Sequence, residues 1–237
     1  MEKQSFRLLR ESESSWWYRG RALIIRRAIE HYLTFRGGDV LDVGAGFGGL
    51  FDTLQHFGKV TGVEPDATAR EVCGIKSYKK VVATIPDATD HKYSLIGMFD
   101  VLEHTSDDRD VLLKLHTLLV PNGVLAITVP AYQWLWSDHD LAHHHFRRYT
   151  RTSLGNALSE TGYRIEYLGY WNTIFFIPAC IIRLLGLTGK SALGLPRFLD
   201  KILFFLIAIE SLLIPRLQLP FGLSVIVIAK PDHGDAS

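Results

Sequence analysis

Short apolar runs alternate with segments of helical periodicity along most of the chain. Apolar runs that stop at turn residues are typical of buried parallel strands, whereas apolar residues three or four apart are typical of helices. Strands that alternate with helices form right-handed βαβ units, so we expect an α/β fold around a parallel sheet. The pattern predicts strands at 39–43, 59–64, 93–99, 124–129, 163–170 and 223–229, and helices at 16–35, 50–57, 67–73, 109–119 and 152–161.

Two further segments lie outside this alternation. The first is the helix at 16–35, which precedes the first strand. The second is a stretch of about 50 residues between the last two strands, far more than a hairpin needs, with apolar helical stretches at 174–185 and 198–214. We therefore predict one domain over residues 1–237, with an N-terminal lid or packing helix in 13–36 and an apolar helical insert in 171–221.

Composition excludes some classes of function. The 237 residues are 47% hydrophobic and 22% charged with a net charge of +1, so no strong field attracts nucleic acid and no such partner is expected. Cys73 and Cys180 form no CxxC pair, which argues against a cysteine zinc site. The polar start lacks a signal-peptide core, and no apolar run reaches the roughly 18 residues of a membrane span, so we expect a cytoplasmic protein.

A glycine-rich loop follows the first predicted strand. Gly44, Gly46 and Gly48 allow a ligand to approach the backbone closely, and the next helix adds partly positive N–H groups. In a doubly wound sheet this loop lies at the strand edge where ligands bind. The loop also satisfies the dinucleotide pattern G-x-G-x-x-G, and Glu64 after the second strand suits the ribose of either cofactor. An NAD(P)-dependent oxidoreductase therefore stands as an alternative.

Asp42, two residues before the first glycine, favours a different ligand. A carboxylate there would repel a pyrophosphate but attract a ligand that carries an ammonium and a sulfonium group. The segment 40–48 then resembles the first motif of class I S-adenosylmethionine-dependent methyltransferases, and 63–66 resembles their ribose motif. Segments 99–104 and 119–125 are similar to the fourth-strand motif of the ubiquinone-methyltransferase-like subgroup (type 11/23) and to the turn before the fifth strand.

This resemblance implies a fold and a cofactor. The fold would be a Rossmann-like seven-stranded sheet, mostly parallel with the last strand antiparallel, with helices on both faces. The cofactor would be S-adenosyl-L-methionine and the product S-adenosyl-L-homocysteine, although a catalytically silent binding protein could share the fold. The implied contacts are Asp42, Gly44, Ala45, Gly46, Gly48, Glu64, Pro65 and Asp100. The family's acidic adenine contact after the third strand has no clear match here, so backbone contacts and packing by Ile85 are expected in its place. Trp17 and Arg21, from an aromatic–arginine start typical of a bacterial subgroup, would add a lid, unless Trp17 only packs in the core.

The stretch 134–150 is the most unusual in the chain, and it resembles the pattern H-D-x-x-x-x-H-x-R-R-Y-T of that bacterial subgroup. The loop after the fifth strand helps to form the acceptor pocket in this fold. A histidine can take a proton from a hydroxyl or amine near neutral pH. We therefore place catalysis at His145, His139, Asp100 and Tyr149, and acceptor binding at Trp136, Arg147, Arg148 and His104.

Each of these roles has a purely structural alternative. The arginines can bind a carboxylate or phosphate, or they can form internal salt bridges. The histidines can make structural hydrogen bonds only. A metal site is not favoured, because no matching carboxylate–histidine spacing occurs elsewhere in the chain.

The apolar insert at 171–221 is relevant to the chemical class of the acceptor. Its two helical stretches carry charges and are too short to span a membrane, yet they are more apolar than one face packed on a sheet requires. They could form a self-packed cap, a peripheral membrane contact, a homodimer contact or a pocket for a lipid. The expected function is methyl transfer to an oxygen or nitrogen atom of a small-molecule or lipid-like acceptor.

Overall fold

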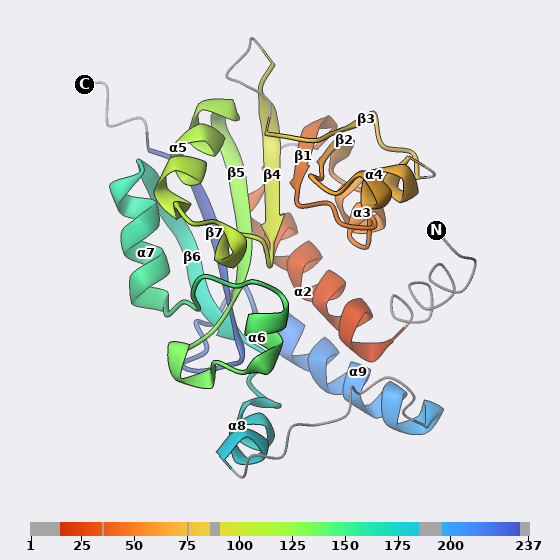
Figure 1. The fold of residues 1–237 in the computed structure, drawn as a ribbon, viewed down its shortest axis with the longest axis vertical. Helices are drawn as coiled ribbons and strands as arrows, with labels where there is room; N and C mark the ends of the chain where they lie inside the picture. Colours follow the sequence, from red (N-terminus) through yellow and green to blue (C-terminus); the bar gives the residue numbers. More distant parts are fainter. Residues whose placement is uncertain (1–14, 35, 75, 86–90, 185–195, 233–237) are drawn as a thin grey trace.

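The computed structural model describes residues 15–34, 36–74, 76–85, 91–184 and 196–232, with the side chains of residues 139, 183 and 184 left out. Its centre is a seven-stranded sheet with the order β3-β2-β1-β4-β5-β7-β6 (Figure 1). β7 is antiparallel to both of its neighbours, and the other pairings are parallel, which confirms the predicted fold class. The strands are β1 (Gly38–Val43), β2 (Gly58–Val63), β3 (Lys80–Val82), β4 (Tyr93–Phe99), β5 (Leu119–Pro130), β6 (Tyr163–Trp171) and β7 (Ser224–Pro231).

The predicted helices are all present, with small shifts at their ends. They are α2 (Trp16–Tyr32), α3 (Phe51–Leu54), α4 (Ala67–Cys73), α5 (Asp108–Leu118), α7 (Arg151–Glu160), α8 (Phe176–Leu184) and α9 (Arg197–Leu213). The structure adds β3 and three short helices that the sequence pattern did not predict, because three to five residues are too few to show a period. These helices are η1 (Leu102–His104), η2 (Gln133–Leu135) and α6 (Asp138–Ala142).

Each face of the sheet is covered by its own set of helices. Leu112 and Leu115 of α5 and Leu158 of α7 belong to a buried cluster on one face. Ile24 of α2 and Ile207 of α9 belong to the cluster on the other face. Residues that alternate along the central strands point to opposite clusters, as expected for a strand that is buried on both sides.

The two segments outside the βαβ alternation pack against each other. α2 and α9 run side by side below the sheet (Figure 1), and a Cβ at Gly20 would come 2.6 Å from Cγ2 of Ile207. Asp200 near the start of α9 accepts a hydrogen bond from the backbone N–H of Trp16 at 2.8 Å and forms an ion pair with Arg19. The inserted helix is therefore attached to the N-terminal helix. In the part of the chain that is described, no helix is both long and apolar enough to cross a membrane.

The register of the parallel strands determines where the site lies. Val43 at the end of β1 pairs with Val63 of β2 and with Met98 of β4. The segments that follow these three strands therefore emerge at one edge of the sheet. Those segments carry the glycine loop, Glu64 and Asp100.

Candidate cofactor and acceptor site

The glycine loop needs its glycines for two separate reasons. Gly44, Gly46 and Gly48 have φ values of +73°, +55° and +79°, a region that side chains other than Gly disfavour. A Cβ at Gly44 would lie 2.3 Å from Cγ2 of Val101, whereas a Cβ at Gly46 would meet no atom within 4 Å. The loop thus approaches the segment after β4 tightly at Gly44 and leaves open space at Gly46.

Two cavities meet at this loop. The smaller one, of about 190 Å³, has Arg21, Asp42, Ala45 and Gly46 in its wall. The larger one, of about 680 Å³, is mainly apolar and contacts Val43, Pro65, Ile85 and Val101. Gly44 lines both cavities. The site therefore suits an elongated ligand with a charged end and a flat apolar end. Gly48 lines neither cavity; its carbonyl accepts a hydrogen bond from Nζ of Lys76 at 2.7 Å.

Asp42 is a buried carboxylate in the wall of the smaller cavity. Its Oδ2 accepts a hydrogen bond from the hydroxyl of Tyr78 at 2.7 Å. Burial raises the pKa of Asp42 to about 6, and the hydrogen bond from Tyr78 and the charge of Arg21 oppose this rise. A cationic group of a ligand in the cavity would favour the ionised carboxylate, as predicted for an ammonium group.

Glu64 joins the glycine loop to the end of β2. Its Oε2 accepts a hydrogen bond from the N–H of Gly46, and its Oε1 accepts one from the N–H of Asp66, both at 2.8 Å. Each carboxylate oxygen can accept a second hydrogen bond. The predicted role of Glu64 toward two ribose hydroxyls is therefore compatible with its contacts.

Arg21 of α2 reaches across to the end of β4. Its Nη2 lies 2.6 Å from Oδ2 of Asp100 and donates to the carbonyl of Phe99 at 3.0 Å. Asp100 has a φ of +57°, and its Oδ1 accepts a hydrogen bond from Thr128 at 3.1 Å. The N-terminal helix is thus joined to the end of β4 by an ion pair, and Arg21 also lines the smaller cavity.

Trp17 has a different environment from Arg21. Its ring stacks on Trp171 with a centroid distance of 5.3 Å and an interplanar angle of 17°. It lines neither of the two cavities at the glycine loop. The prediction that Trp17 contacts the cofactor is therefore not supported. The packing alternative describes it better, because its apolar surface is covered by the core beside β6.

The predicted acceptor loop contains a fully buried carboxylate, Asp140. It accepts hydrogen bonds from Nε and Nη2 of Arg148 at 2.7 and 2.9 Å, and from the N–H and hydroxyl of Ser137. Nδ1 of His145 lies 2.8 Å from its Oδ1. Burial alone would raise the pKa of Asp140, but the hydrogen bonds and charge of Arg148 hold it well below its usual range.

His145 lies in a cluster with Glu103 and His104. The rings of His104 and His145 meet edge to face with centroids 4.5 Å apart, and Trp136 lies 6.5 Å from His145. Burial and the charge of Asp100 raise the pKa of Glu103 to about 9. Burial and the charge of His145 lower the pKa of His104. The structure therefore brings together three predicted residues, His104, Trp136 and His145, and it adds Glu103, for which the 99–104 segment predicts no role.

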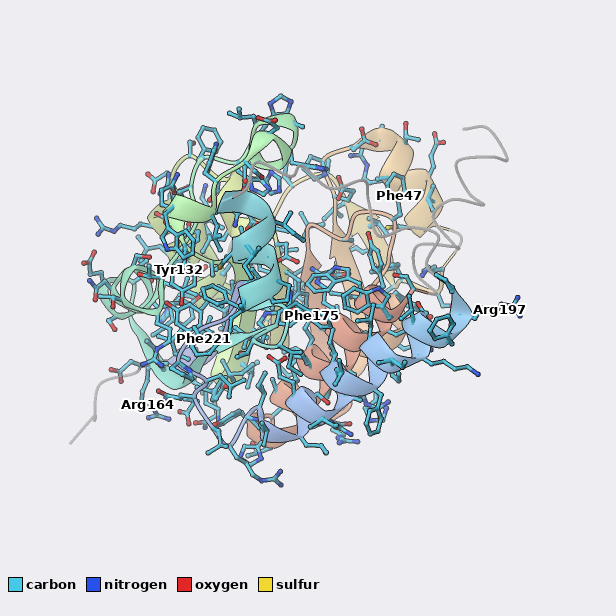
Figure 2. All side chains as sticks on the ribbon, turned by 90° about the horizontal axis from the view of Figure 1, so that it is seen from below. Phe47, Tyr132, Arg164, Phe175, Arg197 and Phe221 are labelled. Carbon is cyan, nitrogen blue, oxygen red and sulfur yellow. The ribbon has the colours of Figure 1, made fainter. Side chains whose placement is uncertain are left out.

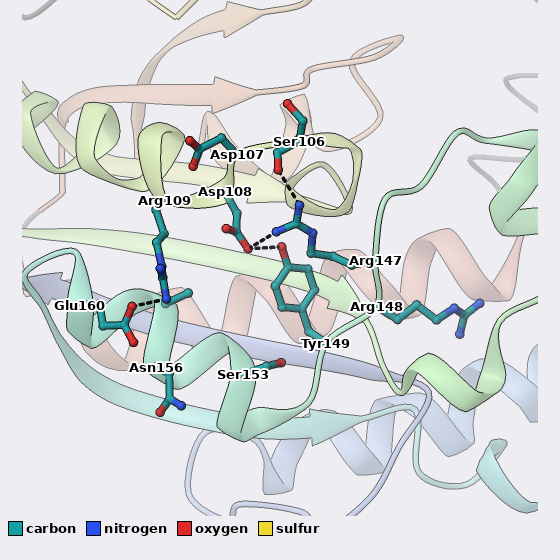
Figure 3. Close-up of a pocket in the computed structure, with 11 residues that line it drawn as sticks. Ser106, Asp107, Asp108, Arg109, Arg147, Arg148, Tyr149, Ser153, Asn156 and Glu160 are labelled. Carbon is teal, nitrogen blue, oxygen red and sulfur yellow. Dashed lines mark hydrogen bonds and ion pairs between the residues drawn. The ribbon is translucent and has the colours of Figure 1, made fainter.

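Other predicted acceptor residues lie apart from this cluster. Arg147 pairs with Asp108 at 3.1 Å, and the hydroxyl of Tyr149 donates to the same carboxylate at 2.8 Å (Figure 3). Both line a separate cavity of about 570 Å³. Burial raises the pKa of Tyr149 far above its ordinary value, so this hydroxyl is unsuited to proton transfer and its predicted catalytic role is not supported.

Both arginines form internal salt bridges, which is the structural alternative to binding an acceptor. Arg148 pairs with Asp140, and Arg147 pairs with Asp108. Each guanidinium therefore already has an anionic partner. The side chain of His139, which was predicted to be catalytic, lies outside the described residues.

A sequence model of a family described as "Methyltransferase domain" matches residues 16–168, more than half of the chain. The chain belongs to this methyltransferase family. No curated protein matches it. The family assignment replaces the two alternatives, an oxidoreductase and a silent binding protein.

Solved structures share the fold of the methyltransferase. An S-adenosylmethionine-dependent methyltransferase from Mesorhizobium loti has 15% identity and a TM-score of 0.57, covering 86% of this chain and 95% of that chain. One from Archaeoglobus fulgidus has 18% identity and a TM-score of 0.54, covering 87% and 90%. A TehB-like one from Corynebacterium glutamicum has 14% identity and a TM-score of 0.54, covering 88% of each chain. At such low identity these structures show the fold alone.

The cofactor of the methyltransferase is S-adenosylmethionine, and S-adenosylhomocysteine is the product. The described residues fit this molecule. The buried carboxylate of Asp42 lines the smaller cavity, and Glu64, which lines neither cavity, retains acceptor capacity beside Gly46. The larger, apolar cavity beside Ile85 suits a flat base.

Proposed function

We propose that the methyltransferase acts on a lipid-like acceptor, an amphiphile whose polar end carries the oxygen or nitrogen atom that receives the methyl group. The polar end would lie at the cluster of Glu103, His104 and His145, and the apolar part would extend toward the helical insert. The observation that carries the proposal is the apolar outer surface of α8 and α9.

Both helices of the insert expose a series of large apolar side chains. On α9 the side chains at positions 198, 202, 205, 209 and 212 follow one another at helical spacing, and they are between 42% and 63% exposed. On α8 the side chains of Ile177, Ile181 and Ile182 are also exposed. Exposed apolar side chains that follow one another at helical spacing favour a site for a partner, a membrane or a ligand. We call this surface the apolar face of α8 and α9.

A series of aromatic rings connects this face with the acceptor loop. The ring of Phe176 on α8 lies 5.6 Å from that of Tyr132, 6.1 Å from that of Trp134 and 5.3 Å from that of Phe221. Figure 2 shows Tyr132 and Phe221 beside α8 on the same side of the molecule. The acceptor loop continues from Trp134 to Trp136, next to His145. These rings support a path along which the apolar chain of an acceptor would pass from the insert to the cluster.

The apolar face also has the charge distribution of a surface that binds an anionic bilayer. Arg197 and Lys201 are exposed at one end of α9, and Arg216 is exposed just beyond its other end. The two acidic residues of α9 are withdrawn, since Asp200 pairs with Arg19 and Glu210 is buried. Amphipathic helices with cationic ends bind membrane interfaces in this way. We therefore favour a lipid surface over a second copy of the chain as the occupant.

S-adenosylmethionine supplies an electrophilic methyl group on a positively charged sulfur. The neutral thioether that remains after methyl transfer is a good leaving group. The protein therefore has mainly to align the two reactants. Asp42, Glu64 and the glycine loop would hold the donor, and the Arg21–Asp100 pair would close its polar end. The acceptor's polar end would be held and deprotonated at the cluster of Glu103, His104 and His145.

The acceptor proposal is tested with a series of phenols that share one head group and differ in alkyl chain length. Each buried methylene contributes about 0.8 kcal/mol, or roughly a fourfold gain in affinity. We expect kcat/KM to rise steeply with chain length until the insert is covered. Equal kcat/KM for short and long chains would refute a lipid-like acceptor and leave a small polar molecule as the substrate.

A further inference from the structure

We propose that Glu103, His104 and His145 form a binding site for one divalent transition-metal ion such as Zn²⁺. Each side chain offers one ligand atom, and these atoms lie within 4.8 Å of one another. Ligands around tetrahedral zinc are about 3.3 Å apart, so shifts of at most about 1.5 Å complete the site. His104 is exposed, so such a shift of its ring would change its hydrogen bond with the backbone of His143 but not the core.

The contacts of His145 are those of a metal-binding histidine. A ligating histidine commonly gives its second ring nitrogen to a carboxylate, which fixes the orientation of the ring. Here Nδ1 of His145 lies 2.8 Å from Oδ1 of Asp140, so Nε2 is the nitrogen that would bind the metal. Asp140 is itself held by Arg148 and Ser137. The ring is therefore oriented before any metal arrives.

Glu103 supplies the second, independent observation. Its side chain is 1% exposed, and its Oε2 has no hydrogen-bond partner among the described residues. A buried carboxyl oxygen without a partner is costly, and such an atom calls for an explanation, which a bound cation provides. The backbone N–H of Phe146 donates to the carbonyl of Glu103 at 2.7 Å, which fixes the loop of His145 against η1.

The donor set limits the kind of metal. Two imidazoles and one carboxylate suit zinc, manganese, iron or cobalt, whereas Mg²⁺ and Ca²⁺ prefer oxygen ligands. Three protein ligands also leave an open coordination position. Under the proposed function, that position would bind the acceptor's oxygen atom and favour its ionised form. His145 would then be a metal ligand and not the free base that the sequence predicted.

Metal binding is measured on the full chain after treatment with a chelator, without cofactor or acceptor. We expect one Co²⁺ per chain, with visible absorption bands that Zn²⁺ abolishes. Glu103→Gln and His104→Ala should each weaken binding by more than tenfold, and Asp140→Asn should weaken it by about 10- to 100-fold. His144→Asn is the matched control, because His144 is exposed in the same loop with a φ of +56°, which asparagine tolerates.

Absence of a stoichiometric Co²⁺ spectrum would overturn the metal site, as would unchanged affinity in Glu103→Gln and His104→Ala. Equal loss in His144→Asn would point to nonspecific histidine binding and would also overturn it. His104 is exposed, so His104→Ala keeps the test valid even if a core variant unfolds. Chain-length dependence of kcat/KM is measured separately. A metal site without that dependence would leave the inference standing and remove the lipid-like acceptor.

Discussion

The N–H of Gly46 donates a hydrogen bond to Oε2 of Glu64 at 2.8 Å, so the carboxylate that the sequence predicts to bind the ribose also orders the glycine loop. This contact joins two motifs that are 18 residues apart in the sequence. Removal of the carboxylate should therefore affect the donor in two ways, through the loss of ribose acceptors and through a looser loop.

Glu64→Ala should weaken the binding of S-adenosylhomocysteine by at least about tenfold, because hydrogen bonds to charged groups contribute about 1.5–3 kcal/mol each. Glu64→Gln keeps one acceptor oxygen and should lose less. Titration calorimetry measures both, and Glu71→Gln, an exposed carboxylate change on α4, is the control. Wild-type affinity in Glu64→Ala would show that the ribose lies elsewhere.

Asp42 should make the methyltransferase less stable as the pH rises. Burial raises its pKa from 3.8 to about 6, so the folded state holds the proton more tightly than the unfolded state. The stabilising contribution is complete below pH 3.8 and is lost between about pH 4 and 6, as ionisation of the buried group begins to cost free energy. The total is up to about 3 kcal/mol.

Asp42→Asn should remove this pH dependence and raise the free energy of unfolding at pH 7, since an amide oxygen can still accept from Tyr78. The same variant should bind S-adenosylhomocysteine more weakly, because the ligand's ammonium loses its anionic partner. Urea unfolding at pH 4 and pH 7 measures the first effect and calorimetry the second. A variant that is less stable than wild type at pH 7 would contradict the assigned sign.

The proposed donor site could be predicted from the sequence because each of its parts follows a strand end. Gly44 and Glu64 come directly after β1 and β2, and parallel strands bring their carboxyl ends to one edge. Arg148 and Tyr149 had no such local signal. Their partners, Asp140 and Asp108, were assigned only when the packing of the loop after β5 was known. The sequence alone does not distinguish an arginine that forms an internal ion pair from one that binds a ligand.

Glu103 likewise shows that the sequence does not reveal contacts made by tertiary packing. It stood in a recognised motif, but its burial and its proximity to His145 depend on how the loop at 143–146 packs on η1. Glu103 and His104 are adjacent, but the third residue of the proposed metal site, His145, lies about forty residues further along, so no short ligand spacing indicated this site. β3 escaped prediction for a simpler reason, since its three residues are too few for an alternating pattern.

Gly44→Ala should abolish cofactor binding and lower stability, because the new Cβ would lie 2.3 Å from Cγ2 of Val101. Gly37→Ala is the matched control: its φ of +91° is also positive, but a Cβ there would meet no atom within 4 Å. Both variants therefore carry the cost of a positive φ, of order 1 kcal/mol, and only Gly44→Ala adds the collision. Thermal unfolding and calorimetry with S-adenosylhomocysteine separate the two costs, and equal behaviour of the two variants would rule out a steric role for Gly44.

Replacement of Ile202 and Phe205 by serine should detach the protein from lipid. The two side chains are 51% and 62% exposed on the apolar face of α8 and α9, so the change should leave the fold intact. Burial of such side chains contributes about 1.5–3 kcal/mol each. The affinity for anionic vesicles, measured by co-sedimentation, should therefore fall by at least about tenfold. Leu113→Ser on α5, 51% exposed and on the other side of the sheet, is the control. Wild-type protein that ignores vesicles but forms a dimer, which the double variant disrupts, would assign the face to a second copy of the chain.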